Sequence, residues 1–481
     1  MSTAIVWFRR DLRLADHPAL SAALAAHDAV VPVYIHAPEE ESPWEPGAAS
    51  RWWLDRSLER FTRRLEGRKS RLVVRRGPSL EALQALRRSS GATAVYWQRA
   101  YEPGVAARDA RVAAALEADG ARVVTCRGAL LVEPDAVLSQ AGTPYRVFSA
   151  YWKAWYARLS VASTMPAPKR IPAPDRWPPG SVLRDLELAP AHAWADGLEA
   201  RWEAGEDGAN RRLAAFCDEG LEHYPTARDR PGTDGVSGLS PYLHFGELSP
   251  RQLWHAVQAI GEGGGAAGRT GAESFLRQLA WREFAAYVLH HWPDTDRRSM
   301  DRRFDRFPWR TGYGDLLRRW QQGRTGYPMV DAGMRELWHT GWMHNRARML
   351  AASFLVKNCR VPWHEGARWF WDTLVDADLA NNSLGWQWVA GTGVDAAPYF
   401  RIFSPIRQGE RFDSEGAYVR RWLPELAHVP DRWVHQPWVG AEAGRRDRAW
   451  DAADYAPRVV DFDLTRREAL TAHRELRAGG R

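Results

Sequence analysis

The sequence predicts an α/β N-terminal domain, built on a doubly wound parallel five-stranded sheet, joined by a long connector to an all-α C-terminal domain. Five short β-rich runs alternate with helical stretches through the first 130 residues, a Pro-rich segment follows, and helical periodicity dominates from about residue 200. Alternation of this kind is typical of a parallel sheet covered by helices. We therefore expect domains at residues 1–130 and 201–481, with residues 131–200 as the connector.

The β-rich runs and the helical stretches of the first domain follow one another in regular order. The expected strands are residues 4–8, 29–35, 71–76, 94–98 and 122–126, and the expected helices are residues 17–26, 50–65, 79–88 and 104–118. Such a sheet offers a crevice at the carboxyl ends of its strands. No GxGxxG motif follows the first strand, which excludes the common dinucleotide-binding fingerprint.

Proline and glycine mark the remaining boundaries. The segment MPAPKRIPAPDRWPPG (165–180) predicts an extended connector, and GEGGGAAGRTG (261–271) predicts a flexible linker because it lacks the GK[ST] of a phosphate loop. Further on, Pro328 suits the first turn of a helix and Gly341 suits its end, so a second helix is expected to begin near Trp342.

Composition bounds the function. The chain of 481 residues has no run of 18 apolar residues and no signal peptide at MSTAIVWFRRDLRL, so we expect a cytoplasmic protein without a membrane partner. Cys126, Cys217 and Cys359 lie far apart, which predicts buried thiols and neither a disulfide framework nor a metal site. The formal charge of +7 permits a nucleic-acid partner, and the 26 tryptophans can fill a core, stack on bases or carry electrons.

Three segments of the C-terminal half align polar side chains beside large aromatic ones at helical spacing. The first places Gln278, Trp281, Arg282 and Ala285 on one face, the second places Asn345, Arg348, Met349 and Ala352, and the third, if helical, places Asp378, Asn382 and Trp386. Polar groups satisfied between packed helices would explain each stripe alone. Buried arginine and aspartate are costly unless paired or bound, however, and one large, flat, polar-edged ligand would satisfy all three stripes.

The chain resembles the photolyase/cryptochrome flavoprotein family over nearly its whole length. The resemblance begins at VWFRRDLRLADHPAL (6–20) and continues through GLSPYLHFGELSPRQ, LAWREF, GYPMVDAGMRELWHTGWMHNRARM, ADLANNSLGWQW, DAAPYFRIFSP and YVRRWLPEL. It implies an α/β domain, a long connector and a helical domain that holds U-shaped FAD. Within the family the chain looks most like the bacterial cyclobutane pyrimidine dimer (CPD) photolyases.

The resemblance assigns the FAD contacts residue by residue. Asp376 and Asp378 are expected at the ribityl chain and the ring edge, Arg348 is expected to pair with Asp376, and Asn382 is expected at flavin N5. The complete implied FAD set is Tyr224, Ser237, Leu239, Ser240, Arg282, Asn345, Arg348, Asp376, Asp378 and Asn382.

The resemblance also assigns the electron-transfer and DNA residues. Trp386, Trp363 and Trp309 match the family's three-tryptophan chain from flavin to surface, although simple packing is the alternative. Together with Asn382 and Gln278 they form the implied catalytic set. The implied DNA and lesion set is Arg228, Gln278, Trp281, Asn345, Arg346, Met349, Trp388, Arg401 and Gln408, with Trp281 and Trp388 as walls of the lesion pocket. The basic segment 297–310 could extend this surface or form an ordinary solvated loop.

Three positions bear on the branch of the family, and four others bear on its cofactor sites. Asn345 and Met349 stand where enzymes for the (6-4) photoproduct typically carry histidines, which favours the CPD branch, whereas Gln278 replaces the glutamate usual in that branch and should weaken a lesion contact. Val236 and Gly238 alter part of the phosphate cradle. Gly104 and Val105 replace the Asn-Glu pair of one folate-binding type, so a folate in another position, a deazaflavin or no antenna chromophore all remain open.

The function implied is light-driven repair of CPDs in DNA, by electron transfer from excited reduced FAD to a flipped-out lesion, which makes the protein a carbon–carbon lyase. A cryptochrome-like blue-light photosensor and (6-4) photoproduct repair are the alternatives. The expected partner is UV-damaged DNA, and we expect a monomer with no obligate protein partner.

Overall fold

The computed structural model describes residues 2–189, 193–396, 400–439 and 455–478, which form two compact units. Unit 1 comprises Met1–Glu222, Ser237–Pro293 and Val375–Leu379, and unit 2 comprises His223–Val236, Asp294–Leu374 and Ala380–Arg481. Each unit therefore contains segments that are distant in sequence. The domain boundaries expected at residues 130 and 200 stay a prediction.

Unit 1 contains the predicted five-stranded parallel sheet, with strand order β3-β2-β1-β4-β5. The strands are β1 (Thr3–Phe8), β2 (Ala29–His36), β3 (Val73–Arg76), β4 (Ala94–Gln98) and β5 (Arg122–Cys126), and the helices between them are α1 (Pro18–Ala26), α2 (Ala48–Glu66), α3 (Ser79–Ser90) and α4 (Pro103–Ala118). Register places Ile5 beside Val31 on one neighbouring strand and beside Val95 on the other. Each expected strand and helix is present, with ends within two residues of those predicted.

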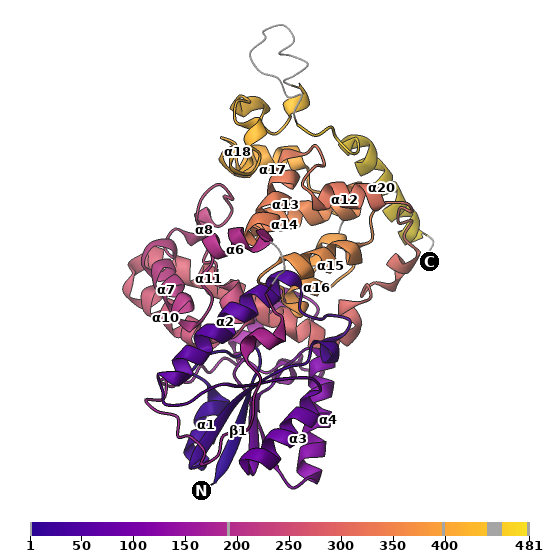
Figure 1. Ribbon diagram of the computed structural model, residues 1–481. Coiled ribbons are helices and arrows are strands. Elements are labelled where there is room, and N and C mark those ends of the chain that lie inside the picture. The colour runs from indigo at the N-terminus through magenta and orange to yellow at the C-terminus, as the bar shows by residue number, and fades with distance from the viewer. Residues whose placement is uncertain (1, 190–192, 397–399, 440–454, 479–481) are drawn as a thin grey trace. The chain divides into compact units, whose positions relative to one another are not determined.

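Helices cover both faces of this sheet, and Figure 1 shows α1 on the opposite side of β1 from α3 and α4. Ile5 and Trp7 pack in one buried cluster with Leu83 of α3 and Val112 of α4. Phe8, whose side chain alternates to the other face, packs against Phe61 of α2 at a ring-centroid distance of 4.8 Å. All six residues of β1 are buried, as in the central strand of a doubly wound sheet.

The rest of unit 1 is helical or irregular. Its elements are η1 (Pro38–Glu41), η2 (Pro134–Ala136), α5 (Phe148–Tyr156), η3 (Leu183–Leu186), η4 (Ala193–Ala195), α6 (Asp196–Arg201), α7 (Glu206–Ala215), the π-helix η5 (Phe216–Gly220), α9 (Ser240–His244), α10 (Pro250–Gly263) and α11 (Gly265–His291). The Pro-rich residues 165–180 form neither helix nor strand, in agreement with the extended connector.

The flexible linker predicted at residues 261–271 is wrong, because these residues are helical except at Gly264, where α10 ends and α11 begins. The glycines permit close packing there. A Cβ on Gly261 would lie 2.9 Å from the side chain of Ala272, and one on Gly271 would lie 2.1 Å from the carbonyl oxygen of Leu221. The segment is rich in glycine because two helices pack closely there, and the same composition is typical of a loop.

The described residues of unit 2 contain no strand, which confirms the all-α character predicted for this part of the chain. Its elements are α8 (Tyr224–Ala227), η6 (Pro293–Asp296), η7 (Arg302–Arg306), α12 (Gly314–Gln321), α13 (Pro328–Thr340), α14 (Asn345–Ser353), the π-helix η8 (Phe354–Asn358), α15 (Trp363–Thr373), α16 (Leu379–Ala390), α17 (Pro405–Phe412), α18 (Ala417–Trp422), η9 (Pro424–Leu426), η10 (Asp431–Trp433) and α20 (Phe462–Ala478).

The helix pair α13 and α14 follows the predicted start and stop. Gly341 adopts φ +66° and ends α13, as expected for a left-handed C-cap. The second helix begins at Asn345, three residues later than expected, because His344 Nδ1 accepts a hydrogen bond from the backbone N–H of Arg346 and caps it. Burial lowers the pKa of His344 to about 4, so the ring is neutral at pH 7.

Two buried carboxyl groups anchor the units. In unit 2, Asp331 is fully buried and accepts hydrogen bonds from the backbone of Thr325 and Gly326, the Thr325 hydroxyl and the Tyr455 hydroxyl. In unit 1, Glu247 is fully buried and accepts from Trp53 and Ser57 side chains and from a backbone N–H. Burial raises the pKa of Glu247 to about 8.

Of the three cysteines, Cys359 is buried as predicted, whereas Cys126 and Cys217 are only partly buried, and all three are thiols. The helices of the described residues include none that is both long and apolar enough to cross a bilayer.

Candidate functional site

Three of the residues expected at the FAD phosphates, Ser237, Leu239 and Ser240, surround Gly238 in unit 1, where the left-handed backbone of the glycine makes the chain turn. Arg212, on α7, donates from Nε to the carbonyl oxygen of Ser237 at 2.6 Å. Gly238 has φ +63°, and a Cβ on it would lie 2.9 Å from Arg212 Nε, so another residue would be strained there and would displace the arginine. The Arg212 guanidinium, which sequence reasoning missed, therefore lies beside the backbone of Ser237 and Gly238.

The two predicted aspartates of unit 1 lie just before α16. Ser240 donates from its hydroxyl to Asp376 at 2.6 Å, and Asp378 Oδ2 lies 3.7 Å from Nδ1 of His244. Because α16 begins at Leu379, Asp378 precedes the helix and does not share a helical face with Asn382, so the three-residue stripe is wrong at its first member. His244 was present in the quoted motif but had no assigned role.

Asn382 and Trp386 lie one turn apart on α16 in unit 2. The side-chain amide of Asn382 donates to the carbonyl oxygen of Ala367 at 3.0 Å, which holds the carboxamide in one orientation. Trp386 is 2% exposed, and its ring contacts Phe370 edge-on at a centroid distance of 5.0 Å. A Cβ on Gly366 would lie only 2.0 Å from this ring, so α15 packs directly against it.

The other two tryptophans of the expected electron chain also lie in unit 2. Trp363 is buried, donates from Nε1 to the Ser299 hydroxyl at 3.2 Å and stacks on His364 at 3.8 Å. Trp309 is partly exposed and packs against Phe307 at 4.6 Å. Exposure thus increases from Trp386 and Trp363 to Trp309, in the order that an electron path to the surface needs. The role of the three as a chain stays a prediction.

The polar face of α14 is formed as its spacing predicts. Asn345 Nδ2 lies 3.6 Å from the sulfur of Met349, and Arg348 donates from Nε to the carbonyl oxygen of Met343 at 2.7 Å. Arg348 belongs to unit 2 and Asp376 to unit 1, so their expected pairing stays a prediction. Tyr224, expected at the phosphates, is buried on α8.

Two of the arginines expected at DNA meet one carboxylate in unit 2. Arg346 forms a bidentate pair with Asp229, with N–O distances of 3.0 and 2.9 Å, and Arg228 Nε lies 3.9 Å from the same group. The Arg346 guanidinium also lies over the ring of Phe412, 4.5 Å from its centroid. Asp229 was not identified from the sequence, because a lone acid in a polar segment carries no signal of its partner.

The expected polar stripe on α11 lies in unit 1. Gln278 donates to the Ser274 carbonyl oxygen at 3.4 Å, and Arg282 donates to the carbonyl oxygen of Ala129 at 3.1 Å. Trp281 stacks face to face on Phe148 of α5, with centroids 3.7 Å apart and planes inclined by 8°. Phe148, in the presumed connector, fixes one face of a predicted lesion-pocket wall and was not foreseen.

Trp388, the other predicted wall, lines a cavity of about 270 Å³ in unit 2 together with Arg401 and Lys357. Lys357 is 2% exposed, donates to the carbonyl oxygen of Arg401 and lies 4.3 Å from the centroid of Phe400. Burial lowers its pKa to about 7. Gln408, on α17, and the exposed Arg401 complete the DNA set in this unit.

The donors present suit the cofactor that the resemblance implies. The Ser237–Gly238 turn with Arg212 offers N–H groups and a hydroxyl for phosphate, while Asp376 and Asp378 offer acceptors for ribityl hydroxyls. These features fit FAD, and its contacts with individual residues stay predictions.

Comparison with known proteins agrees with this chemistry. The family described as DNA photolyase matches residues 4–174, and the FAD binding domain of DNA photolyase matches residues 275–475. A deoxyribodipyrimidine photo-lyase of Agrobacterium fabrum is 40% identical over 98% of this chain and 97% of its own length. Cryptochrome-2 of Arabidopsis thaliana is 38% identical over 96% of this chain and 77% of its own.

Solved structures give the same result. The crystal structure of a bacterial class III photolyase from Agrobacterium tumefaciens superposes with a TM-score of 0.94 at 39% identity, covering 99% of this chain and 98% of that one. A Synechocystis cryptochrome superposes with a TM-score of 0.88 at 27% identity, covering 98% and 99%. With both family domains matched in order and a relative that is 40% identical over 97% of its own length, the chain belongs to the photolyase/cryptochrome family and contains its FAD-binding domain.

Proposed function

We propose that this protein repairs cyclobutane pyrimidine dimers in DNA, using blue or near-UV light to drive an electron from reduced FAD to a flipped-out lesion. The observation that carries the proposal is the 40% identity, over nearly the full length of both chains, to a deoxyribodipyrimidine photo-lyase. Asn345 and Met349, which stand where (6-4) enzymes carry histidines, favour the CPD over the (6-4) photoproduct.

Bound FAD supplies the light-driven electron chemistry. The chain's own residues bind, orient and exclude water. Ser237, Arg212 and the Gly238 turn hold phosphate, and the asparagine at position 382, held by its bond to Ala367, offers hydrogen bonds but no readily donated proton. Buried Trp386 and Trp363 and the more exposed Trp309 carry an electron inward to restore the reduced cofactor.

DNA binding in this proposal rests on arginines and aromatic faces. Trp281, held flat by Phe148, and Trp388 offer stacking faces for the unpaired bases. Arg346, Arg228, Arg401 and Gln408 contact the backbone. Arg346 must exchange Asp229 for a phosphate when DNA binds. The free energy gained from the phosphate contact is therefore reduced by the cost of breaking the ion pair with Asp229.

The direct test is repair of UV-irradiated oligothymidylate by the dithionite-reduced holoprotein under blue light, followed by recovery of absorbance at 260 nm. We expect recovery in the light and none in the dark. Parallel substrates containing a (6-4) photoproduct should stay unrepaired. Failure on both lesions, with a flavin that is still photoreduced, would refute repair and favour the photosensor, which the 38% identity to a plant cryptochrome keeps as the second candidate.

The tryptophan chain is tested by a matched pair on α15. Trp363→Phe should abolish photoreduction of oxidised flavin while the chemically reduced enzyme keeps its repair activity. Trp369→Phe changes a partly exposed tryptophan of the same helix, which stacks on Trp338, and should leave both activities unchanged. If both variants lose photoreduction equally, or if both keep it, the result would contradict a specific role of Trp363 in the electron path.

A further inference from the structure

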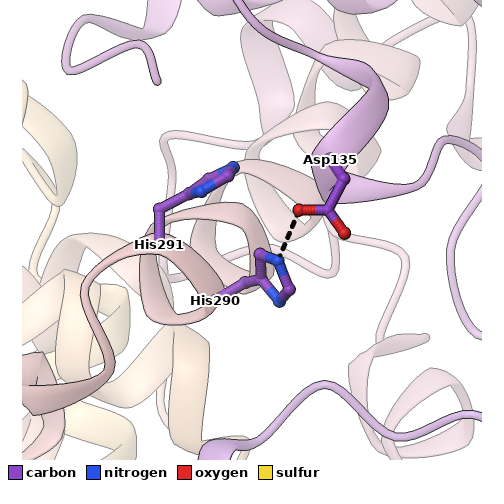
Figure 2. Close-up of side chains that lie close together, drawn as sticks. All are labelled: Asp135, His290 and His291. Atoms are coloured by element: carbon purple, nitrogen blue, oxygen red, sulfur yellow. Dashed lines mark hydrogen bonds and ion pairs between the residues drawn. The ribbon is translucent and has the colours of Figure 1, made fainter. Parts of the chain in front are cut away.

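Two histidines and an aspartate converge in unit 1, away from the residues assigned to FAD and DNA. His290 and His291 are the last two residues of α11, and Asp135 lies on η2, so the three come from segments about 155 residues apart. Each offers one ligand atom, and these atoms all lie within 4.8 Å of one another. Figure 2 shows both imidazoles and the carboxylate gathered between the helix end and η2.

Neighbouring groups hold the three side chains in place. His290 Nε2 lies 2.8 Å from the carboxylate of Asp135, and His291 Nε2 lies 3.4 Å from the carbonyl oxygen of Pro134. The His291 ring also packs edge-on against Tyr287, at a centroid distance of 4.5 Å. Both imidazoles therefore point toward η2, although adjacent helical residues ordinarily diverge by about 100°.

We propose that His290, His291 and Asp135 form a site for one divalent transition-metal ion of the Zn²⁺ class. Two imidazoles and one carboxylate are a donor set that suits this class, with a fourth position left to water. The Zn–ligand distance of about 2.0–2.2 Å places neighbouring ligand atoms of a tetrahedral site roughly 3.3–3.5 Å apart. His290 Nε2 and the Asp135 carboxylate oxygen, now 2.8 Å apart, would have to separate slightly. The two ligand atoms that are farthest apart, at no more than 4.8 Å, would have to approach by roughly 1.4 Å, a movement that side-chain rotation allows.

The site lies where a cation is electrostatically favoured. It is at the C-terminal end of a helix of 27 residues, where the last carbonyl groups carry partial negative charge. The carboxylate of Asp135, 73% exposed, and the imidazole of His290, 34% exposed, give an ion access from solvent. Cysteine spacing predicted no metal site, and histidine ligands that only the fold brings together leave no such spacing in the sequence.

A bound ion would link η2 to α11 beside existing hydrogen bonds. Glu283, about two turns before His290 on α11, accepts hydrogen bonds from the backbone N–H groups of Leu131 and Val132 and from Trp155 Nε1. Metal binding would strengthen the connection between the same two segments. In this proposal the ion's role is structural: it stabilises the folded state by an amount that grows with the logarithm of its concentration relative to its dissociation constant.

The test is equilibrium dialysis of untagged, EDTA-treated full-length holoprotein against ZnCl₂, together with thermal unfolding with and without Zn²⁺. Wild type should bind one ion per chain and melt at a higher temperature with Zn²⁺. His290→Ala and the milder, surface-exposed Asp135→Asn should each weaken binding by about tenfold or more, in line with losses seen when metal-site residues are changed, and lose the thermal shift.

His255→Ala is the matched control, because this histidine on α10 lies outside the proposed site and its ring is hydrogen-bonded to the Ala162 carbonyl oxygen. It should bind Zn²⁺ as wild type does. Stoichiometric binding that is unchanged in both His290→Ala and Asp135→Asn would overturn the assignment, as would absence of binding by wild type at millimolar Zn²⁺. Because neither measurement uses light or DNA, the result is independent of the proposed repair activity.

Discussion

Replacement of Gly366 by alanine tests whether the first tryptophan of the expected electron chain is held as tightly as its surroundings indicate. The new methyl group would lie 2.0 Å from Cη2 of Trp386 and 2.5 Å from Cζ3. Carbon atoms in packed interiors lie about 3.5–4.0 Å apart, so the ring or the helix must move by roughly 1.5 Å. Phe370 at 5.0 Å and Trp320 at 6.3 Å, both edge-on, oppose that movement.

The magnitude follows from two opposing effects. Overpacking of a rigid ring costs about 3 kcal/mol, at the upper end for inserted methyl groups. Alanine in place of glycine within α15 recovers about 1 kcal/mol of helix propensity. Gly366→Ala should therefore lower the free energy of unfolding by about 2 kcal/mol. Gly385→Ala, beside Trp386 on α16 and facing open space, should raise it by up to about 1 kcal/mol.

The assay is urea unfolding of both variants and wild type, followed by circular dichroism at 222 nm and by tryptophan fluorescence. Gly366→Ala should be less stable than wild type and Gly385→Ala more stable, so that their free energies of unfolding differ from each other by about 3 kcal/mol. Gly366→Ala should also slow flavin photoreduction, since displacement of Trp386 lengthens an electron transfer step, whereas Gly385→Ala should not. A Gly366→Ala protein as stable as wild type would refute the packing argument.

Three further predictions concern buried ionisable groups. Asp331→Ala should lower the free energy of unfolding by about 3 kcal/mol or more, because it leaves buried donors unsatisfied. Asp315→Ala removes an exposed ion pair on α12 and should lower it by less than about 0.5 kcal/mol. Equal urea midpoints for the two variants would contradict this prediction. Between pH 4.5 and 8 folded Glu247 keeps a proton that the unfolded chain has lost, so its contribution to stability falls as pH rises, and Glu247→Gln should flatten that slope in pH-dependent unfolding. Between pH 7 and 10.5 Lys357 is neutral in the folded protein and protonated in the unfolded chain, so the free energy of unfolding should rise with pH in this range. If a Lys357→Met variant shows the same rise, Lys357 does not cause it.

Several parts of the site were open to prediction because they are local. Asn345 and Met349 meet because they are one helical turn apart, and Asn382 and Trp386 share a face of α16 for the same reason. Arg212 beside Gly238, Asp229 beside Arg346 and Phe148 beneath Trp281 were not foreseen. Each of these pairs joins segments 25 or more residues apart, and residue type alone does not specify such a contact.

The parallel five-stranded sheet, the all-α second part and the family could be predicted from the amino-acid order, because hydrophobic periodicity and dense motifs act over short stretches of chain. The linker predicted at residues 261–271 was wrong, because the glycines there allow two helices to pack closely, and this contact is visible only in the folded structure. Tertiary structure alone decided which side chain faces which: it brought Asp135 to His290 and His291, placed a guanidinium at the Gly238 turn and buried Lys357. The physical reason is that such contacts, and the charge states that burial imposes, depend on distances in space between residues that the chain keeps far apart.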